Sequence, residues 1–376
     1  MNVEFIREPN LLLESIELVY RYVSGKTYED VRNNIIVNYG KSFDDAQTKL
    51  IYDYTSTLSK IMKQACLEVN LRDECTKKLF SKLGNASGGN NMCIAKLMTF
   101  NFADISIIDL FDAADYINRK FHSIIGGRYS FCGVRTPGFI EFAKLSPGDT
   151  KRSLMDQIDT FDLENQYKWE TYKVLSEYDF YFSKLVDIIR PVAKCLKTRL
   201  HDVDDVVEER IAFWKEYLEP HSVEHFVESQ GNNGEKYVKD NARAIIWRVS
   251  CDELVADVDV DSPDWLKMFL GALIVPGAVM ESKNIQIDMV QRSLQVLGNK
   301  KRLEILYLLK NRRLFGYEIA RLVDLDATTV SRHMSALCAS GLVTAAKGEG
   351  HTIYYTSNTN KIRKLLQNTG SLLVES

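Results

Sequence analysis

The chain has 376 residues, more than one ordinary domain holds, so two or three domains are expected. Hydrophobic residues make up 45% of the chain and charged residues 26%, which excludes an intrinsically disordered, collagen-like or purely coiled-coil protein. The net charge of −3 is uneven, because Asn284–Ser376 holds 13 Lys and Arg against 7 Asp and Glu, and this favours a small module for a polyanion attached to an acidic body.

Three features of the sequence bear on cellular location. The longest apolar stretch, Phe269–Met280, has 12 residues, whereas a membrane-spanning helix needs about 20. The first residues show no basic segment followed by an apolar run, so we expect no secretory signal. The seven cysteines are scattered and form no Cys-x-x-Cys pair, which favours neither a disulfide framework nor a zinc knuckle. We therefore expect a cytoplasmic protein with no membrane partner.

Residues 1–283 are predicted to form a large helical domain that could include a few strands. Apolar residues recur at helical spacing over Phe43–Val69, with Ser42 as the expected N-cap, and over Ile105–Phe121. The polar, glycine-rich residues 229–234 predict a loop and an internal break of this domain.

The second half of this domain continues the helical pattern. Asp149–Leu218 is predicted to hold several successive helices, with breaks near Thr160, Pro191 and His201. β-Branched residues within Ala244–Val260 predict a strand or two.

One short motif in residues 1–283 suggests metal chemistry. His221, Glu224 and His225 match the His-x-x-Glu-His pattern of some zinc peptidases, in which two histidines bind the metal and the glutamate is the general base. Pro220 would place the motif at a helix start, and no third ligand is identifiable. Histidines on a polar helix surface are therefore the favoured interpretation, and we expect no metal.

Two further features of residues 1–283 were weighed for ligand binding. Phosphate-binding glycine motifs are absent, so nucleotide binding has no support from the sequence. A run of aromatic residues favours core packing over a ligand pocket. Its members are Tyr167, Trp169, Tyr172, Tyr178, Phe180, Tyr181 and Phe182.

The C-terminal segment has a sharper pattern. Met289–Leu297, Lys300–Lys310 and Phe315–Val323 are predicted helices, and a short turn leads to Asp326, an N-cap residue for a helix over residues 327–340 that Gly341 ends. Two helices joined by so short a turn form a helix-turn-helix unit.

A predicted hairpin follows the helix-turn-helix. Leu342–Ala346 and His351–Ser357 are the expected strands, separated by a turn at residues 347–350. A hairpin in this place is a wing, and Lys361–Gln367 is predicted to be a closing helix.

This order of elements resembles the winged-helix regulators of the ArsR family, over about the last quarter of the chain. The residues that carry the resemblance are Leu297–Leu306, Tyr317–Ala320, Thr329–Met334, Leu337, Ser340–Val343 and Gly350–Tyr355. The resemblance implies a winged helix-turn-helix DNA-binding domain at residues 284–376 and implies nothing about residues 1–283.

Helical spacing predicts which side of the recognition helix is buried. Val330, Met334 and Leu337 fall on one face and are expected to pack against the preceding helices. The expected partners of that face are Ile319, Leu322 and Leu306. Leu303 and Leu309, with Ile305, are expected to face inward from the helix over residues 300–310.

The opposite face of the same helix is expected to enter the major groove. Arg332 can form a bidentate pair with guanine O6 and N7. Thr328 and the methyl group of Ala327 can contact a thymine methyl group, and Ser335 lies on the same face.

Other side chains are expected to contact the DNA backbone. Thr329 and Ser331 flank the reading face near the positive end of the helix, where phosphate oxygens bind. Lys347 and His351 flank the tip of the wing and are candidates for phosphate or minor-groove contact.

Two residues near this surface are expected to have structural roles. Arg302 matches an arginine of the resembled family and is expected to pair with Glu318. His333 lies to one side of the helix, where a hydrogen bond inside the domain is one interpretation.

The resembled family also implies a homodimer. There, the helix before the first core helix and the last helix form the dimer, and Ile285–Leu297 and Lys361–Leu366 occupy these places here. The cysteine and His or acidic ligands of the metal-sensing members have no counterparts, so we expect no cofactor.

We therefore expect a sequence-specific DNA-binding transcription regulator, a repressor and not an enzyme. It would read an inverted repeat of double-stranded DNA as a homodimer and respond to a small-molecule or protein effector at residues 1–283. The alternatives are a metal-dependent hydrolase domain, through the motif at residues 221–225, fused to the DNA-binding module, or a protein-interaction scaffold.

Overall fold

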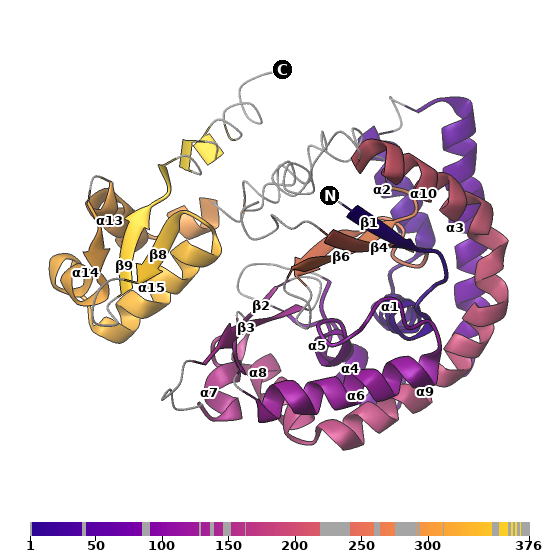
Figure 1. Ribbon diagram of the computed structural model, residues 1–376, viewed down its shortest axis with the longest axis horizontal. Coiled ribbons are helices and arrows are strands. Elements are labelled where there is room, and N and C mark those ends of the chain that lie inside the picture. The colour runs from indigo at the N-terminus through magenta and orange to yellow at the C-terminus, as the bar shows by residue number, and fades with distance from the viewer. Residues whose placement is uncertain are drawn as a thin grey trace. The chain divides into compact units, whose positions relative to one another are not determined.

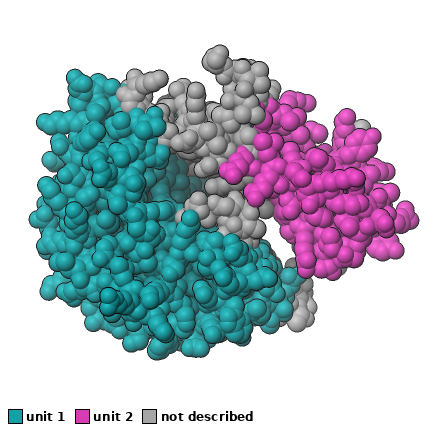
Figure 2. Space-filling view, turned by 180° about the vertical axis from the view of Figure 1, so that it is seen from behind, with its two compact units in different colours: residues 1–280 teal, residues 281–376 magenta. Residues whose placement is uncertain are grey.

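The chain folds into two compact units, residues 1–280 (unit 1) and residues 281–376 (unit 2), which are coloured separately in Figure 2. The computed structural model describes sixteen segments of the chain. These are residues 2–39, 43–84, 91–127, 129–135, 139–145, 152–161, 163–218, 241–258, 264–274, 291, 294–310, 312–347, 353–359, 362–363, 365–366 and 369.

A four-stranded mixed sheet lies at the centre of unit 1. Its order is β1 (Asn2–Ile6), β4 (Asn241–Trp247), β6 (Trp265–Gly271) and β5 (Leu254–Val258). The first three strands are parallel, with Asn241 opposite both Asn2 and Trp265, and β5 runs antiparallel to β6. The central strands β4 and β6 are almost wholly buried, as their apolar runs require.

The sheet contains more strands than the sequence had located in the helical domain. The strands predicted within residues 244–260 are present as β4 and β5, but β1 and β6 were not predicted. Five residues in β1 and seven in β6 give too short a pattern to distinguish a buried strand from a buried helix.

Six helices fill the first part of unit 1 (Figure 1). They are α1 (Leu11–Val23), α2 (Tyr28–Tyr39), α3 (Asp45–Ala65), α4 (Glu74–Phe80), α5 (Ile94–Thr99) and α6 (Leu110–Gly126). Side-chain oxygens of Asn10, Asp44, Asp73 and Asp109 cap α1, α3, α4 and α6. Asp44, and not the predicted Ser42, is the cap of α3, and Gln47 completes its capping box.

A hairpin and a series of helices complete the unit. These elements are β2 (Tyr129–Arg135), β3 (Phe139–Lys144), α7 (Leu154–Ile158), α8 (Asn165–Ser176), α9 (Tyr178–Arg199), the 3-10 helix η2 (Leu200–Val203) and α10 (Asp204–Leu218). The predicted break near Pro191 is wrong, because Pro191 lies inside α9, a single helix of 22 residues. Contacts of α9 with α1, α3, α4 and α6 hold the helix together despite the missing hydrogen bond.

The aromatic run is divided between core and surface. Tyr178, Tyr181 and Phe182 are buried in the main core, whereas Trp169 and Phe180 are about half exposed. Core packing is therefore confirmed for these three residues of α9 and, as partly buried side chains against the same core, for Tyr167 and Tyr172 of α8. Within the described ranges, no helix combines the length and apolar character needed to cross a bilayer.

Unit 2 has the predicted order of elements. It contains α13 (Lys300–Leu309), β7 (Leu314–Phe315), α14 (Gly316–Val323), α15 (Ala327–Ala339), β8 (Val343–Lys347) and β9 (Ile353–Ser357). The strands form a small antiparallel sheet in the order β7-β9-β8. Most of the predicted helices over 289–297 and 361–367 lies outside the described residues.

Two of the predicted core leucines of unit 2 are exposed. Leu303 is 49% exposed because Ile305 and Leu309, four residues apart, define the buried side of α13, and Leu303 lies about 200° from Ile305. Leu322 is 45% exposed, and Val323 takes its expected place in the core.

Candidate DNA-binding surface

The turn between α14 and α15 sets the relative direction of the two helices. Asp324 ends α14 in the left-handed conformation, with φ 53°, and is the one non-glycine residue with positive φ in the described part of the chain. Its backbone N–H bonds to the carbonyl of Ala320. Lys301 of α13 donates to the carbonyl of Val323 at 2.6 Å, which satisfies a C-terminal carbonyl of α14. The predicted helix-turn-helix is thus confirmed.

One face of α15 is fully packed. Val330, Met334 and Leu337 are 1%, 2% and 0% exposed and belong to the core that contains Ile319 and Val323. Burial of such side chains contributes about 1.5–3 kcal/mol each to stability. This confirms the predicted orientation of α15, because rotation of the helix would expose all three side chains.

The opposite face of α15 is open to solvent. The predicted base-reading residues Ala327, Thr328, Arg332 and Ser335 are all exposed, as is Ser331, which was expected to contact phosphate. Arg332 makes no ion pair or hydrogen bond with the residues that the structure describes, so its guanidinium group is available for an external partner. The structure therefore brings these five side chains together on one helix face.

Thr329 differs from its neighbours because it takes part in the helix cap. Asp326 accepts the backbone N–H of Thr329 at 2.8 Å and its hydroxyl at 2.6 Å. These bonds lower the pKa of Asp326, so the cap is ionised at neutral pH. The hydroxyl hydrogen of Thr329 is used inside the protein, which leaves this side chain less suited to a phosphate contact than Ser331.

The expected pair between Arg302 and Glu318 is absent. Arg302 instead donates to Nδ1 of His333 and to the carbonyl of Val296, both at 3.4 Å. Glu318 accepts the backbone N–H of Phe315 at 3.1 Å, three residues earlier, and this local bond competes with a pair across helices.

His333 therefore has the structural role that was one of its two interpretations. Because Arg302 only donates, Nδ1 of His333 must be the unprotonated ring nitrogen. Partial burial and the nearby guanidinium group lower the pKa of His333, so its ring is neutral at physiological pH.

The wing is formed by β8 and β9, whose register pairs Val343 with Ser357 and Lys347 with Ile353. Lys347 ends β8 on the side of the wing tip, but the tip and His351 lie outside the described residues. Arg313 was not predicted as a site residue. Its guanidinium group lies 5.1 Å from the ring of Tyr354 in β9, so a cation is fixed beside the wing. Arg312 and Arg313, two adjacent arginines before β7, are the feature of the sequence that could have indicated this site.

The other proposed site falls outside this surface. The motif of His221, Glu224 and His225 lies outside the described residues. Among the residues that are described, no group of three or more His, Cys, Asp or Glu side chains is placed to hold a metal ion.

Comparison with known proteins places the same segment in a family. Residues 299–345 match the family model described as bacterial regulatory protein, arsR family. This match covers α13, α14, α15 and the start of the wing. The C-terminal unit is an ArsR-type winged helix-turn-helix domain.

Individual relatives match the ArsR-type domain alone. The transcriptional activator HlyU of Vibrio cholerae serotype O1 is 28% identical over 74 residues, which are 20% of this chain and 68% of HlyU. The crystal structure of NolR from Sinorhizobium fredii is 26% identical and covers 27% of this chain and 97% of NolR, with a TM-score of 0.21.

A third relative is the homodimeric winged helix-turn-helix DNA-binding domain of a possible ArsR-family transcriptional regulator from Mycobacterium bovis. Its solution structure is 31% identical and covers 25% of this chain and 90% of that domain, with a TM-score of 0.21. The family match indicates DNA-binding transcription regulation for the ArsR-type domain.

Proposed function

We propose that this protein is a transcription repressor that binds an inverted repeat as a homodimer and responds to a signal received by unit 1. The observation that carries the proposal is the division of α15 into a dry face, with Val330 and Met334, and an open face, with Arg332. A helix held in this way presents a fixed row of side chains to the major groove.

Base recognition is assigned to the open face of α15. Arg332 pairs with O6 and N7 of a guanine, which discriminates between bases by about 1–3 kcal/mol. Thr328 and Ala327 contact thymine methyl groups, and Ser335 extends the same row. Each of these side chains is exposed and lies on one helix.

Affinity is assigned to contacts with the DNA backbone. Ser331 lies near the start of α15 and Lys347 at the end of β8, and His351, which is outside the described residues, is assigned the same role. Thr329 is left out because its hydroxyl donates to Asp326. Each phosphate that a cation such as Lys347 neutralises releases counterions and adds about −0.9 to the slope of log K against log salt, whereas a hydroxyl contact adds no such dependence.

The inverted repeat follows from symmetry. Two copies of α15 related by a two-fold axis read two half-sites about 34 Å apart, one turn of DNA. The relative from Mycobacterium bovis is described as homodimeric, which supports this arrangement. A signal at unit 1 controls DNA binding only if it has different affinities for the DNA-binding and non-binding states.

The proposal assigns no catalytic step and no cofactor to the chain, and it places the protein in the cytoplasm with its DNA. It also assigns repression, whereas HlyU is named an activator. A reporter gene controlled by the selected binding site distinguishes the two, since repression requires higher expression when the regulator is deleted.

Selection of bound fragments from random duplex DNA tests the reading face. Wild-type protein, Arg332→Ala and the control Lys310→Ala, which changes an exposed lysine outside α15, are compared. We expect a palindromic motif with wild type and control, and loss of preference at one guanine of each half-site with Arg332→Ala. The same motif with all three proteins would remove Arg332 from base recognition.

A further inference from the structure

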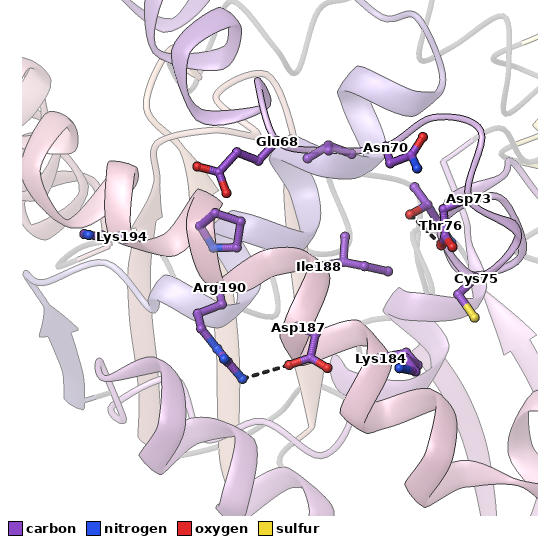
Figure 3. A pocket seen from close by; sticks show the side chains of 12 residues that line it. Glu68, Asn70, Asp73, Cys75, Thr76, Lys184, Asp187, Ile188, Arg190 and Lys194 are labelled. Carbon is purple, nitrogen blue, oxygen red and sulfur yellow. Dashed lines mark hydrogen bonds and ion pairs between the residues drawn. The ribbon is translucent and has the colours of Figure 1, made fainter.

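A hollow of about 690 Å³ lies on the surface of unit 1, where the end of α3 and the turn before α4 face the middle of α9 (Figure 3). Val69, Ile188 and Pro191 supply its apolar lining. The volume lies within the range of small-molecule sites, about 300–1,000 Å³. Charged side chains of both signs complete the lining.

Some of these charges are already engaged with one another. Nη2 of Arg190 lies 2.8 Å from Oδ1 of Asp187. Asp73 caps α4 and accepts the backbone N–H of Thr76 at 2.7 Å. By contrast, three charged residues of the hollow form no ion pair with any part of the chain that the structure describes. These are Glu68, Lys184 and Lys194.

The spacing of these three exposed charges sets the length of a ligand, and Nζ of Lys184 also lies 5.9 Å from the ring of Phe180. Lys184 and Lys194 are ten residues apart on α9, about 15 Å along its axis. In Figure 3 Glu68 lies toward the Lys194 end of the hollow, and Lys184 lies toward the opposite end, with Asp73. An extended peptide advances about 3.3 Å per residue. Three to five residues therefore span the distance between the two ends.

Pro191 adds a feature that suits a peptide backbone. It has no amide hydrogen to donate to the carbonyl of Asp187, four residues earlier, so one helical hydrogen bond is missing beside the hollow. The carbonyl of Asp187 therefore lacks its helical donor. Leu67 and Leu71, on the same turn as Glu68, are 79% and 44% exposed and offer apolar surface at the rim.

We propose that this hollow binds a peptide of three to five residues with free ends and apolar side chains, and that the peptide is the signal received by unit 1. Its ammonium group pairs with Glu68 and its carboxylate with Lys184, while Lys194 donates to a peptide carbonyl. Apolar side chains cover Val69 and Ile188. The second half of this proposal rests on the proposed function.

Titration calorimetry of the full chain tests the site with a defined probe. The probe is the tetrapeptide Ala-Leu-Leu-Ala with free ends, compared with its N-acetylated and its C-amidated forms. Saturable binding of the free peptide at one site is expected, and each blocked form should bind about tenfold more weakly, because each loses a charge-assisted hydrogen bond.

Variants connect each end of the peptide to its partner. Glu68→Gln should weaken binding of the free peptide about tenfold but leave the N-acetylated form unchanged. Lys184→Met should weaken binding of the free peptide about tenfold but leave binding of the C-amidated form unchanged. Lys197→Met changes an exposed lysine of α9 outside the hollow and should have no effect.

Several outcomes overturn the site. They are equal binding of free and blocked peptides, loss of binding in Lys197→Met, and no saturable heat with the free peptide. The regulatory half is measured separately, as the affinity for a selected operator with and without saturating peptide, and an unchanged affinity overturns it. Sequence-specific DNA binding without peptide binding would contradict the peptide site but leave the proposed function intact. Absence of any DNA sequence preference would contradict the proposed function itself.

Discussion

The ion pair between Glu17 of α1 and Lys96 of α5 is the most informative interaction to break in unit 1. The carboxylate and ammonium groups are 2.7 Å apart, and both side chains are at most 3% exposed. Lys96 also donates to the carbonyl of Asn91 at 3.2 Å and lies 4.4 Å from the ring of Tyr20. The pair therefore joins two helices inside the core.

The expected cost follows from this geometry. At 2.7 Å and an effective dielectric constant of about 20, the Coulomb attraction is about 6 kcal/mol, and desolvation of the two charges offsets much of it. Removal of Lys96 leaves Glu17 buried without its partner, whereas removal of Glu17 leaves Lys96 with the charge of Glu253. Lys96→Met should therefore lower the free energy of unfolding by about 3–5 kcal/mol and Glu17→Leu by less, whereas the double variant should lose about 2 kcal/mol or less.

Urea unfolding followed by tryptophan fluorescence measures this effect in unit 1 alone, because Trp169, Trp214, Trp247 and Trp265 all lie there. The exposed pair of Arg119 and Asp115 is the matched control, since a double-mutant cycle should give a coupling free energy of at most about 0.5 kcal/mol.

Two results would refute the reasoning about the buried pair. One is a loss below about 1 kcal/mol for Lys96→Met, and the other is a double variant that loses the sum of both single variants. Either result would mean that water or other groups compensate each charge independently.

Three further predictions concern other buried or strained positions. Burial raises the pKa of Glu14 to about 7, so the folded state binds its proton more tightly and this stability is present below pH 4.5 and lost as pH rises through 7. Relative to wild type, Glu14→Gln should therefore gain about 2–3 kcal/mol in urea unfolding between pH 5 and pH 8, and a constant difference would contradict the assignment. A methyl group at Gly271 would lie 2.7 Å from the carbonyl oxygen of Glu253, so Gly271→Ala should lower the free energy of unfolding by about 1–3 kcal/mol. Gly126→Ala is the control in thermal unfolding, because its methyl group meets open space and should cause no such loss. Asp324 has φ 53°, so a β-branched valine there should cost about 1–2 kcal/mol and weaken DNA binding, while Asp324→Asn should be neutral in circular dichroism melts.

The candidate site was more predictable than the fold of unit 1. The elements of the ArsR-type domain follow one another within about 60 residues, and each is marked locally, by the cap at Asp326, the end at Gly341 and the inward spacing of Val330 and Met334. Such signals need no knowledge of distant chain segments. The pair of Arg302 and His333 was not predicted, because it depends on how α13 crosses α15.

The sequence by itself thus determined the winged helix, which face of α15 is exposed and the helices of residues 45–65 and 110–126, since periodicity and capping are local properties. Tertiary structure alone decided that β1 pairs with β4 across more than two hundred residues, that Lys96 is buried with Glu17, and that the buried Arg21 pairs with the partly exposed Asp252. It also decided that α9 passes through Pro191. Packing energy summed over many distant contacts exceeds the local cost of a missing hydrogen bond or a desolvated charge, and no window of sequence contains that sum.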